Sequence, residues 1–274
     1  MKSRNLPRGL LLDMDGVLYH GDRPLPGARE FLDATARLPR VFVTNNPIRT
    51  PAEVATKLRS LGLGEIPEPA ILTSGVAAAR WLAREKPDYR FYAVGADGLH
   101  RELARFGVED AEAADFVVVG EGPGLDYETL TRGLRLLLAG ARLISTNPDT
   151  TVDAVRSGEH WVLPGGGALV APFEVASGRR AITIGKPEPL LFEMALEQLG
   201  LSAADCVMIG DRPDTDILGA QRLGIATVLV RTGRFAPGEP WPGGWQVPDW
   251  DVPDLRALSK IWQGLGFLSS PPSG

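Results

Sequence analysis

Several residue types are scarce in this chain of 274 residues, and each scarcity excludes a class of protein. Cys206 is the only cysteine, so an intrachain disulfide is excluded, and we expect a reducing compartment, the cytoplasm. The cysteine and the three histidines do not fall in zinc-type spacing. The apolar run Leu10–Leu12 is too short for a signal peptide, and no run approaches the roughly 18 apolar residues of a membrane span. We therefore expect no membrane association.

Basic residues are outnumbered, with 29 Lys and Arg against 34 Asp and Glu, and the net charge is −5. This balance argues against a protein that binds nucleic acid through its phosphate backbone. Only five of the 29 basic residues are lysine. Asparagine occurs four times, and Asn45, Asn46 and Asn147 lie in two short polar segments. Their retention there suggests chemistry, although turn formation explains it equally well.

Short apolar runs rich in β-branched residues alternate with helical patterns along the chain. This alternation predicts βαβ units and a mostly parallel sheet. The region 237–253 is rich in Pro, Gly and Trp and is predicted to be irregular, and residues 269–274 are predicted to form a frayed tail. The predicted strands are Gly9–Leu12, Arg40–Val43, Arg90–Val94, Phe116–Val119, Leu143–Ser145, Trp161–Leu163, Ile182–Ile184, Cys206–Ile209 and Ile225–Val230.

Polar residues of catalytic type follow some of these strands. In open parallel sheets, ligands bind at the carboxyl ends of the strands. Two of these polar segments precede residue 50 and two follow residue 180, so the block between them is an insertion if all share one sheet. The segments are Asp13-Met14-Asp15-Gly16, Thr44-Asn45-Asn46, Gly185-Lys186-Pro187 and Gly210-Asp211.

The aspartates at these strand ends are candidate metal ligands. Asp13 and Asp15 repel each other beside a buried strand, and a divalent cation would relieve that repulsion. The alternative is a simple Asp-Gly turn at Gly16, which is about equally common. Asp211 directly follows another strand, whereas Asp214 is predicted to be only a helix N-cap. Oxygen ligands of this kind favour Mg²⁺ over zinc.

Lys186, Thr44 and Asn45 are candidate partners of an oxyanion. A lysine on a strand-to-helix turn can place its charge against a phosphate, although a solvated loop lysine is the commoner case. The Thr44 hydroxyl and the Asn45 amide are neutral donors, and an Asx-type turn before Pro47 is the alternative. Considered together, the four segments predict metal-assisted phosphoryl transfer through a carboxylate nucleophile.

The four segments resemble the motifs of the haloacid dehalogenase-like hydrolases. The Thr-Asn-Asn, Gly-Lys-Pro and Gly-Asp-Arg-x-x-Thr-Asp sequences are specific to the subfamily with a type IIA cap. That subfamily includes NagD-like, p-nitrophenyl phosphate, pyridoxal phosphate and phosphoglycolate phosphatases, and the resemblance extends to about residue 232. The matching stretches are Asp13-Met14-Asp15-Gly16-Val17-Leu18, Val43-Thr44-Asn45-Asn46, Gly185-Lys186-Pro187 and Gly210-Asp211-Arg212-Pro213-Asp214-Thr215-Asp216-Ile217.

The resemblance implies an α/β fold: a Rossmann-like, doubly wound parallel-sheet core with an inserted smaller α/β cap domain. The core would comprise residues 1–88 and 180–274, and the cap residues 89–179. The segment Thr146-Asn147-Pro148-Asp149 would form a cap loop that faces the active site. A homodimer is favoured, because dimers formed through the cap occur in the subfamily.

The resemblance also implies roles for individual residues. Asp13 would be the nucleophile and Asp15 the general acid and base. Mg²⁺ would be held by the Asp13 carboxylate, the main-chain carbonyl of Asp15 and Asp211. Asp216 would support these ligands without contacting the ion directly. The phosphoryl oxygens would be bound by Thr44, Asn45 and Lys186, with Asn46 nearby.

The function implied is a Mg²⁺-dependent phosphatase that hydrolyses small-molecule phosphate monoesters through an aspartyl-phosphate. Two alternatives stay open. One is a dehalogenase. Asp15 argues against it, because dehalogenases of the family lack an acid at that position. Hydrolysis of a phosphate ester, by contrast, needs an acid to protonate the leaving group. The other is a catalytically weak member that binds or senses a phosphorylated ligand, against which the complete set of chemical residues argues.

Overall fold

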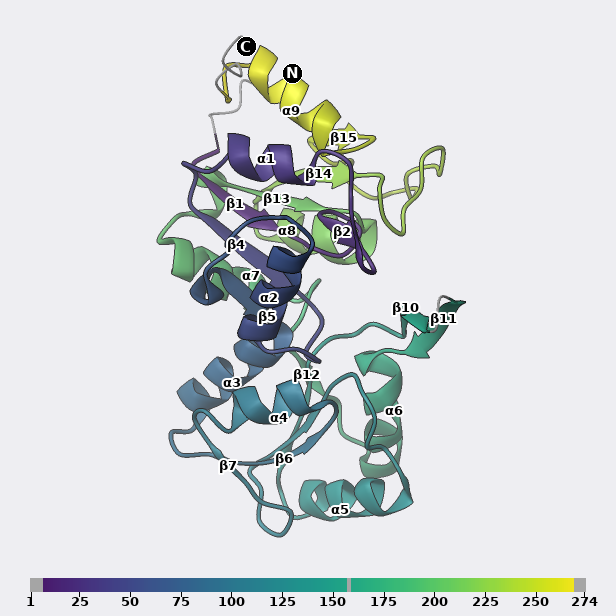
Figure 1. The fold of residues 1–274 in the computed structure, drawn as a ribbon. Helices are drawn as coiled ribbons and strands as arrows, with labels where there is room; N and C mark the ends of the chain where they lie inside the picture. Colours follow the sequence, from purple (N-terminus) through teal and green to yellow (C-terminus); the bar gives the residue numbers. More distant parts are fainter. Residues whose placement is uncertain (1–6, 157–158, 269–274) are drawn as a thin grey trace. The chain divides into compact units, whose positions relative to one another are not determined.

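The strand predicted at Gly9–Leu12 lies in the middle of a six-stranded sheet in the computed structural model (Figure 1). The strands are β1 (Gly9–Leu12), β4 (Arg40–Thr44), β5 (Ile71–Thr73), β13 (Cys206–Gly210), β14 (Ala226–Val230) and β15 (Trp250–Val252). Their order is β15-β14-β13-β1-β4-β5, and β1 pairs in parallel with both β13 and β4. The chain therefore winds outward from β1 in one direction and from β13 in the other. The carboxyl ends of these two strands lie at the switch point of a doubly wound sheet.

The structure describes residues 7–156 and 159–268, so the predicted tail at 269–274 lies outside the described residues. The chain divides into two units. The first comprises Met1–Val43, Ala55–Ile71 and Phe192–Gly274, and the second comprises Thr44–Val54 and Leu72–Leu191. The second unit contains the whole predicted cap segment 89–179 together with flanking residues. The assignment of residues 1–88 and 180–274 to the core and 89–179 to the cap stays a prediction.

Helices cover both faces of the first sheet. Figure 1 shows α1 (Ala28–Ala34) and α9 (Leu255–Gly264) on one side and α7 (Pro189–Leu199) and α8 (Leu218–Arg222) on the other. The indole of Trp262, on α9, is fully buried and lies 5.7 Å from the ring of Phe31 on α1. Burial on both faces explains why β1 reads as a continuous apolar run rather than an alternating one. Helix α2 (Pro51–Ser60) and the short hairpin of β2 (Tyr19–His20) and β3 (Arg23–Pro24) complete the N-terminal part.

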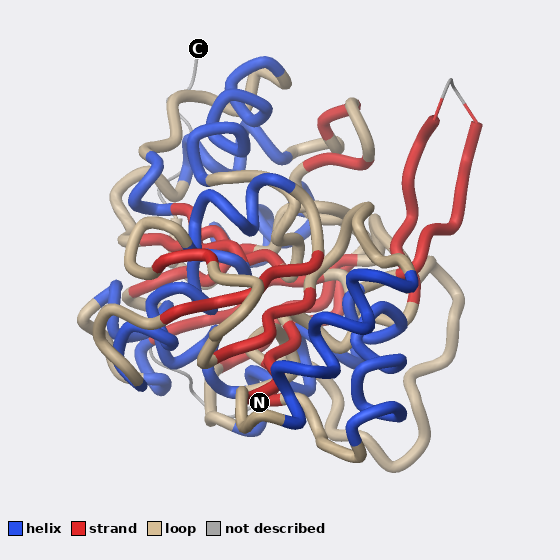
Figure 2. The backbone as a smooth tube through the Cα atoms, turned by 90° about the horizontal axis from the view of Figure 1, so that it is seen from below, coloured by secondary structure: helices blue, strands red, loops and turns tan. Residues whose placement is uncertain are grey.

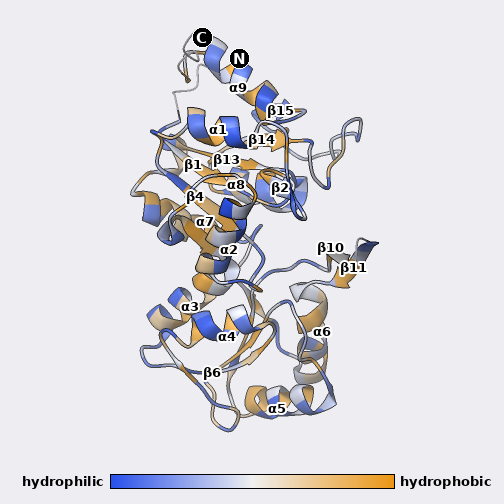
Figure 3. Cartoon of the chain, viewed as in Figure 1, coloured by the Kyte–Doolittle hydropathy of each residue, from blue (hydrophilic) through white to orange (hydrophobic). Residues whose placement is uncertain are grey.

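The second unit has its own sheet in the order β12-β9-β8-β6-β7. The strands are β6 (Arg90–Val94), β7 (Val108–Glu109), β8 (Phe116–Val119), β9 (Arg142–Ser145) and β12 (Ile182–Thr183), and all their pairs are parallel. Helices α5 (Tyr127–Leu138) and α6 (Gly166–Ser177) bury Leu136, Leu137 and Phe173 against it, and α3 (Ser74–Glu85) packs with α4 (Asp97–Leu103). Hydrophobic residues concentrate on the strands, as Figure 3 shows.

A two-stranded antiparallel hairpin projects from the second unit (Figure 2). It consists of β10 (Thr151–Arg156) and β11 (Glu159–Pro164). The predicted strand at 161–163 is part of β11, but β10 was not predicted. Its described residues alternate between exposed and half-buried positions, with the polar Thr151 and Asp153 outward, so it contains no apolar run.

The prediction that residues 237–253 are irregular is wrong for the end of that region. Trp250–Val252 forms β15, which pairs in parallel with β14, and α9 follows it. The strand has only three residues beside prolines, too few to show a period. The prediction that Asp214 is an N-cap is also wrong. Arg212 is the N-cap of the π-helical turn Pro213–Ile217, and the Asp214 carboxylate accepts a 2.7 Å hydrogen bond from the Arg212 guanidinium.

Candidate active site

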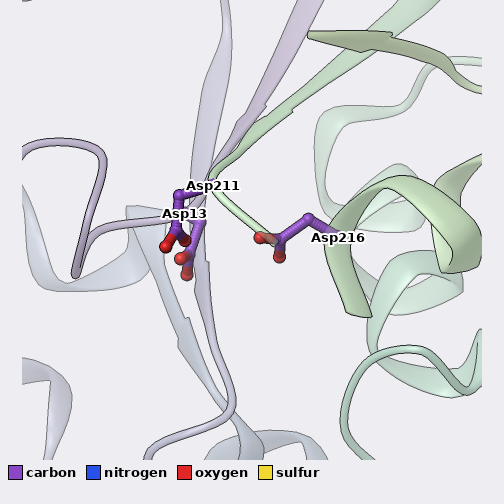
Figure 4. A group of neighbouring side chains, drawn as sticks. All are labelled: Asp13, Asp211 and Asp216. Carbon is purple, nitrogen blue, oxygen red and sulfur yellow. The ribbon is translucent and has the colours of Figure 1, made fainter. Parts of the chain in front are cut away.

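Three aspartates of the first unit converge at the switch point of the sheet. Asp13 directly follows β1 and Asp211 directly follows β13, and the Asp13 N–H donates to the carbonyl of Ile209 on β13 over 2.9 Å. Asp216 lies in the π-helical turn. One carboxylate oxygen from each aspartate lies within 4.8 Å of the others, and Figure 4 shows Asp13 and Asp211 side by side with the Asp216 carboxylate pointing toward them. The structure thus places Asp13, Asp211 and Asp216 together, and the roles predicted for them stay predictions.

This group of carboxylates is buried, and burial determines what it can bind. The exposed fractions are 8% for Asp13, 3% for Asp211 and 0% for Asp216. Like charges so close together repel strongly away from water, and each loses its hydration as well. A divalent cation with oxygen ligands relieves both costs. The arrangement therefore fits a metal ion such as the one the sequence predicts.

The loop after β14 supports Asp211, and sequence reasoning missed it. The N–H of Arg234 donates to Oδ2 of Asp211 over 2.8 Å, and the Thr232 hydroxyl donates to the carbonyl of Gly16 over 2.6 Å. A Cβ on Gly233 would lie 1.9 Å from Oδ2 of Asp211, so only glycine fits there. The signal was present: Thr232 to Arg234 follow the last predicted strand, as the four recognised segments follow theirs.

Glycine is also required at two further positions of the site, Gly16 and Gly210. Gly16 has φ +80° and a Cβ there would lie 2.5 Å from Oδ2 of Asp211, so the Asp-Gly turn and the carboxylate site are parts of one structure. A Cβ on Gly210 would lie 2.4 Å from Cγ of Asp216. Asp216 also accepts a 3.1 Å hydrogen bond from the N–H of Arg212, which fixes its carboxylate.

Asp15 stands apart from this group. Its side chain is 62% exposed, and Oδ1 lies 3.7 Å from Nδ1 of His20. The isolated bridge between Asp15 and Tyr19 fixes the backbone of the turn. Because the Asp15 carboxylate is exposed, it can exchange protons with solvent. The buried carboxylates of the group cannot do so.

Asn45 and Lys186 lie together in the second unit. The side-chain amide of Asn45 donates to the Lys186 carbonyl over 2.9 Å, and its oxygen accepts from the Lys186 N–H over 2.7 Å. Lys186 is only 2% exposed, so the interpretation as a solvated loop lysine is wrong. Buried ammonium groups need anionic partners. Asn45 also donates to Oδ2 of the buried Asp149 over 2.9 Å.

Thr44 and Asn46 form turns. The Thr44 oxygen accepts from the N–H of Asn46 over 3.2 Å, and Oδ1 of Asn46 accepts from the N–H of Ile48 over 2.9 Å. The turn alternative therefore holds for Thr44 and also describes Asn46, whereas the Asn45 side chain bonds the Lys186 backbone and Asp149 instead. In these turns Thr44 and Asn46 act as acceptors, so the Thr44 hydroxyl and the Asn46 side-chain NH₂ can still donate.

Glu121 is a buried carboxylate that sequence reasoning missed. It is 2% exposed, and it accepts from Nδ2 of Asn147 over 2.9 Å and from Nδ2 of Asn46 over 3.4 Å. Asn147 also donates to the carbonyl of Asn45 over 2.8 Å. The predicted cap-loop residue Asn147 is thus bonded to the predicted phosphate-binding segment. The sequence around Glu121 is rich in glycine and resembles an ordinary turn, which hid this role.

Comparison with known proteins agrees with the geometry. A model of the haloacid dehalogenase-like hydrolases matches residues 10–109, and an HAD-hydrolase-like model matches residues 183–258. An acid sugar phosphatase from Staphylococcus haemolyticus is 37% identical over 230 residues, which cover 82% of this chain and 86% of the relative. The p-nitrophenyl phosphatase of Archaeoglobus fulgidus superimposes with a TM-score of 0.86 at 30% identity, covering 94% of this chain and 100% of that one. NagD from E. coli K-12 gives 0.80 at 32% identity, covering 92% and 98%.

The chain belongs to the haloacid dehalogenase-like hydrolases. Within that family it lies among the NagD-like and p-nitrophenyl phosphatases, and it is a phosphoric monoester hydrolase. The predicted α/β fold with a parallel-sheet core is confirmed by the structure and by these neighbours. Among the described residues, no helix is long and apolar enough to cross a bilayer.

Proposed function

We propose that the chain is a Mg²⁺-dependent phosphatase that hydrolyses small-molecule phosphate monoesters through an aspartyl-phosphate on Asp13. The observation that carries this proposal is the group formed by Asp13, Asp211 and Asp216, three buried carboxylates within 4.8 Å. Mg²⁺ would be held by the Asp13 carboxylate, the main-chain carbonyl of Asp15 and Asp211, with Asp216 completing the anionic surroundings. When bound, the ion neutralises the negative charge of carboxylate and phosphate.

The protein residues carry two steps. A carboxylate oxygen of Asp13 forms a bond to phosphorus while the ester P–O bond breaks, and Asp15 protonates the departing alcohol. Asp15 then takes a proton from water, whose oxygen attacks phosphorus and releases inorganic phosphate and the Asp13 carboxylate. The exposure of Asp15 supports this role, because the same group must both give and take a proton within one turnover.

Thr44, Asn45, Asn46 and Lys186 are proposed to bind the phosphoryl oxygens. The burial of Lys186 supports this, since its ammonium charge has lost much of its hydration and binds an anion strongly as a result. The two hydrogen bonds between Asn45 and the Lys186 backbone fix the segment that carries this charge.

A sugar phosphate is the substrate class we propose first, because curated relatives carry the name acid sugar phosphatase. We also propose a homodimer, which light scattering on a sizing column would test.

The experiment is a hydrolysis assay with p-nitrophenyl phosphate and a panel of sugar phosphates, with Mg²⁺ or with EDTA. Turnover with Mg²⁺ and none with EDTA supports the proposal. Full activity in EDTA contradicts the metal dependence. Phosphate-ester binding without turnover would favour the catalytically weak alternative, and release of halide from a 2-haloacid would favour the dehalogenase.

A further inference from the structure

Arg231, which directly follows β14, anchors the long loop after this strand. Its guanidinium forms a two-bond fork with the Asp251 carboxylate of β15, both bonds 2.7 Å long. The remaining nitrogen, Nη1, donates to the carbonyls of Ala236 over 3.0 Å and Glu239 over 2.8 Å. The ring of Phe235 covers the guanidinium at 4.7 Å. The Arg231 side chain thus bonds both the edge strand β15 and the later part of the loop, residues 235–239.

The first residues of the same loop, 232–234, contact the buried carboxylate group and the turn at Gly16. Thr232 holds the Gly16 carbonyl, Gly233 packs against Asp211, and the N–H of Arg234 donates to Oδ2 of Asp211. The segment 232–234 lies between two fixed points, the Arg231 backbone and the carbonyls that its guanidinium binds. Its placement against Asp211 therefore depends on the Arg231 fork.

We propose that Arg231 is a positioning residue for metal binding, acting through the loop 232–234 on the orientation of Asp211. An arginine suits this task because its planar fork binds a carboxylate and two carbonyls at once, which a lysine cannot do. The inference deepens the proposed function and rests on it, since it assumes that a metal ion binds the carboxylate group. It also gives a role to the Pro-, Gly- and Trp-rich region that follows β14.

The test measures Mg²⁺ binding directly, by isothermal titration of metal-free protein with magnesium chloride. Arg231→Ala should raise the dissociation constant for Mg²⁺ by about tenfold, the lower end of the effect of removing groups that orient metal ligands. The matched control is Arg29→Ala in the same unit. Arg29 likewise bonds a carboxylate, Asp33, and a carbonyl, Gly62, and both partners lie outside the loop 232–234. It should leave the dissociation constant unchanged.

Asp251→Asn is the second variant. If circular dichroism shows that Arg231→Ala does not fold, Asp251→Asn alone tests the proposed role of Arg231. It keeps Arg231 and removes only the charge of its partner, so a smaller increase in the same direction is expected. At saturating Mg²⁺, the KM for p-nitrophenyl phosphate should be unchanged in both variants, whereas general disorder of the site would raise it.

The outcomes separate the two proposals. Unchanged Mg²⁺ binding in Arg231→Ala and Asp251→Asn, with normal binding in the wild type, overturns the inference and leaves the proposed function standing. An equal loss in Arg29→Ala also overturns it, because the effect would then be nonspecific. No Mg²⁺ binding by the wild type overturns the proposed function and this inference together.

Discussion

Asp13 and Asp15 lie two residues apart, yet the structure gives them opposite surroundings. Asp13 is 8% exposed and shares its space with Asp211 and Asp216, whereas the Asp15 side chain is 62% exposed. Burial among anions suits a group that binds a metal and attacks phosphorus. Exposure suits a group that exchanges protons with water. The proposed function therefore gives two chemically identical side chains different roles because their surroundings differ.

Asp13→Asn should abolish steady-state hydrolysis of p-nitrophenyl phosphate while leaving the fold intact. The amide has nearly the shape of the carboxylate, but it is not a competent nucleophile. Circular dichroism controls for folding, and the thermal midpoint should not fall, because one of three repelling charges is removed. Retained turnover at a rate near the wild type would mean that another residue attacks.

Asp15→Ala should slow hydrolysis in proportion to how poor the leaving group is. General acid catalysis contributes about 10²–10⁴-fold when an alkoxide must be protonated, but a nitrophenolate departs readily without a proton. Rapid-mixing experiments should therefore keep the nitrophenolate burst and lose the burst with an alkyl phosphate. Steady-state turnover should fall for both, because Asp15 is also proposed to activate water. Equal loss of the two bursts would rule out Asp15 as the proton carrier.

Glu121→Gln should reduce the free energy of unfolding by roughly 1–3 kcal/mol, the range for a buried hydrogen-bonding group that loses its partner. Glu121 accepts from two amide donors, and a glutamine must turn its own NH₂ toward one of them. Urea denaturation measures the change. The matched control is Glu102→Gln, since Glu102 is similarly buried but bonds an exposed Arg105 over 3.3 Å. Equal losses in the two variants would contradict the importance of the Glu121 network.

At the scale of elements, three fully buried strands were predictable as apolar runs. β1, β8 and β13 are continuous apolar runs because both faces of a parallel sheet are covered, and their predicted bounds agree with the structure to within a residue. β5 and β15 have three residues each, which is too short to display any period. Helix α9 was missed as well, although Asp254 caps it and its apolar face buries Trp262.

Trp262→Ala should destabilise the first unit by about 3–5 kcal/mol, the usual cost of removing a large buried aromatic side chain. Trp262 packs on the rings of Phe31, Trp250 and Phe267, so its loss opens a cavity between α1, α9 and β15. Chemical denaturation followed by circular dichroism measures the change. Ile261→Ala on the same helix is the control, because that side chain is 40% exposed and should matter little. A comparable loss at both positions would contradict the packing described for α9.

The candidate site was predictable to the extent that it follows one rule, polar residues after buried strands. That rule finds Asp13, Asp211 and Thr44, because the carboxyl ends of parallel strands meet at one edge. It does not find Asp216, whose place depends on the π-helical turn and on the absence of a side chain at Gly210. The rule also applies to Glu121, which follows the predicted strand Phe116–Val119, but its role depends on Asn147 and Asn46, which are 26 and 75 residues away.

At the scale of the whole molecule, the central proposal is that phosphate is transferred to Asp13 before it reaches water. Buried carboxylates beside β1 and β13, an exposed acid at Asp15 and a buried Lys186 all serve that covalent step in the proposed function. The relatives named as phosphatases establish the reaction class, but not the intermediate.

Acid quenching during turnover tests this claim most directly. The enzyme is mixed with Mg²⁺ and a phosphate-labelled p-nitrophenyl phosphate, quenched within the burst, digested and mapped by mass spectrometry. The account predicts one acid-stable, hydroxylamine-sensitive phosphoryl group on the peptide that contains Asp13, and none in Asp13→Asn. Label on a different residue, or steady turnover with no labelled peptide at any quench time, would contradict it.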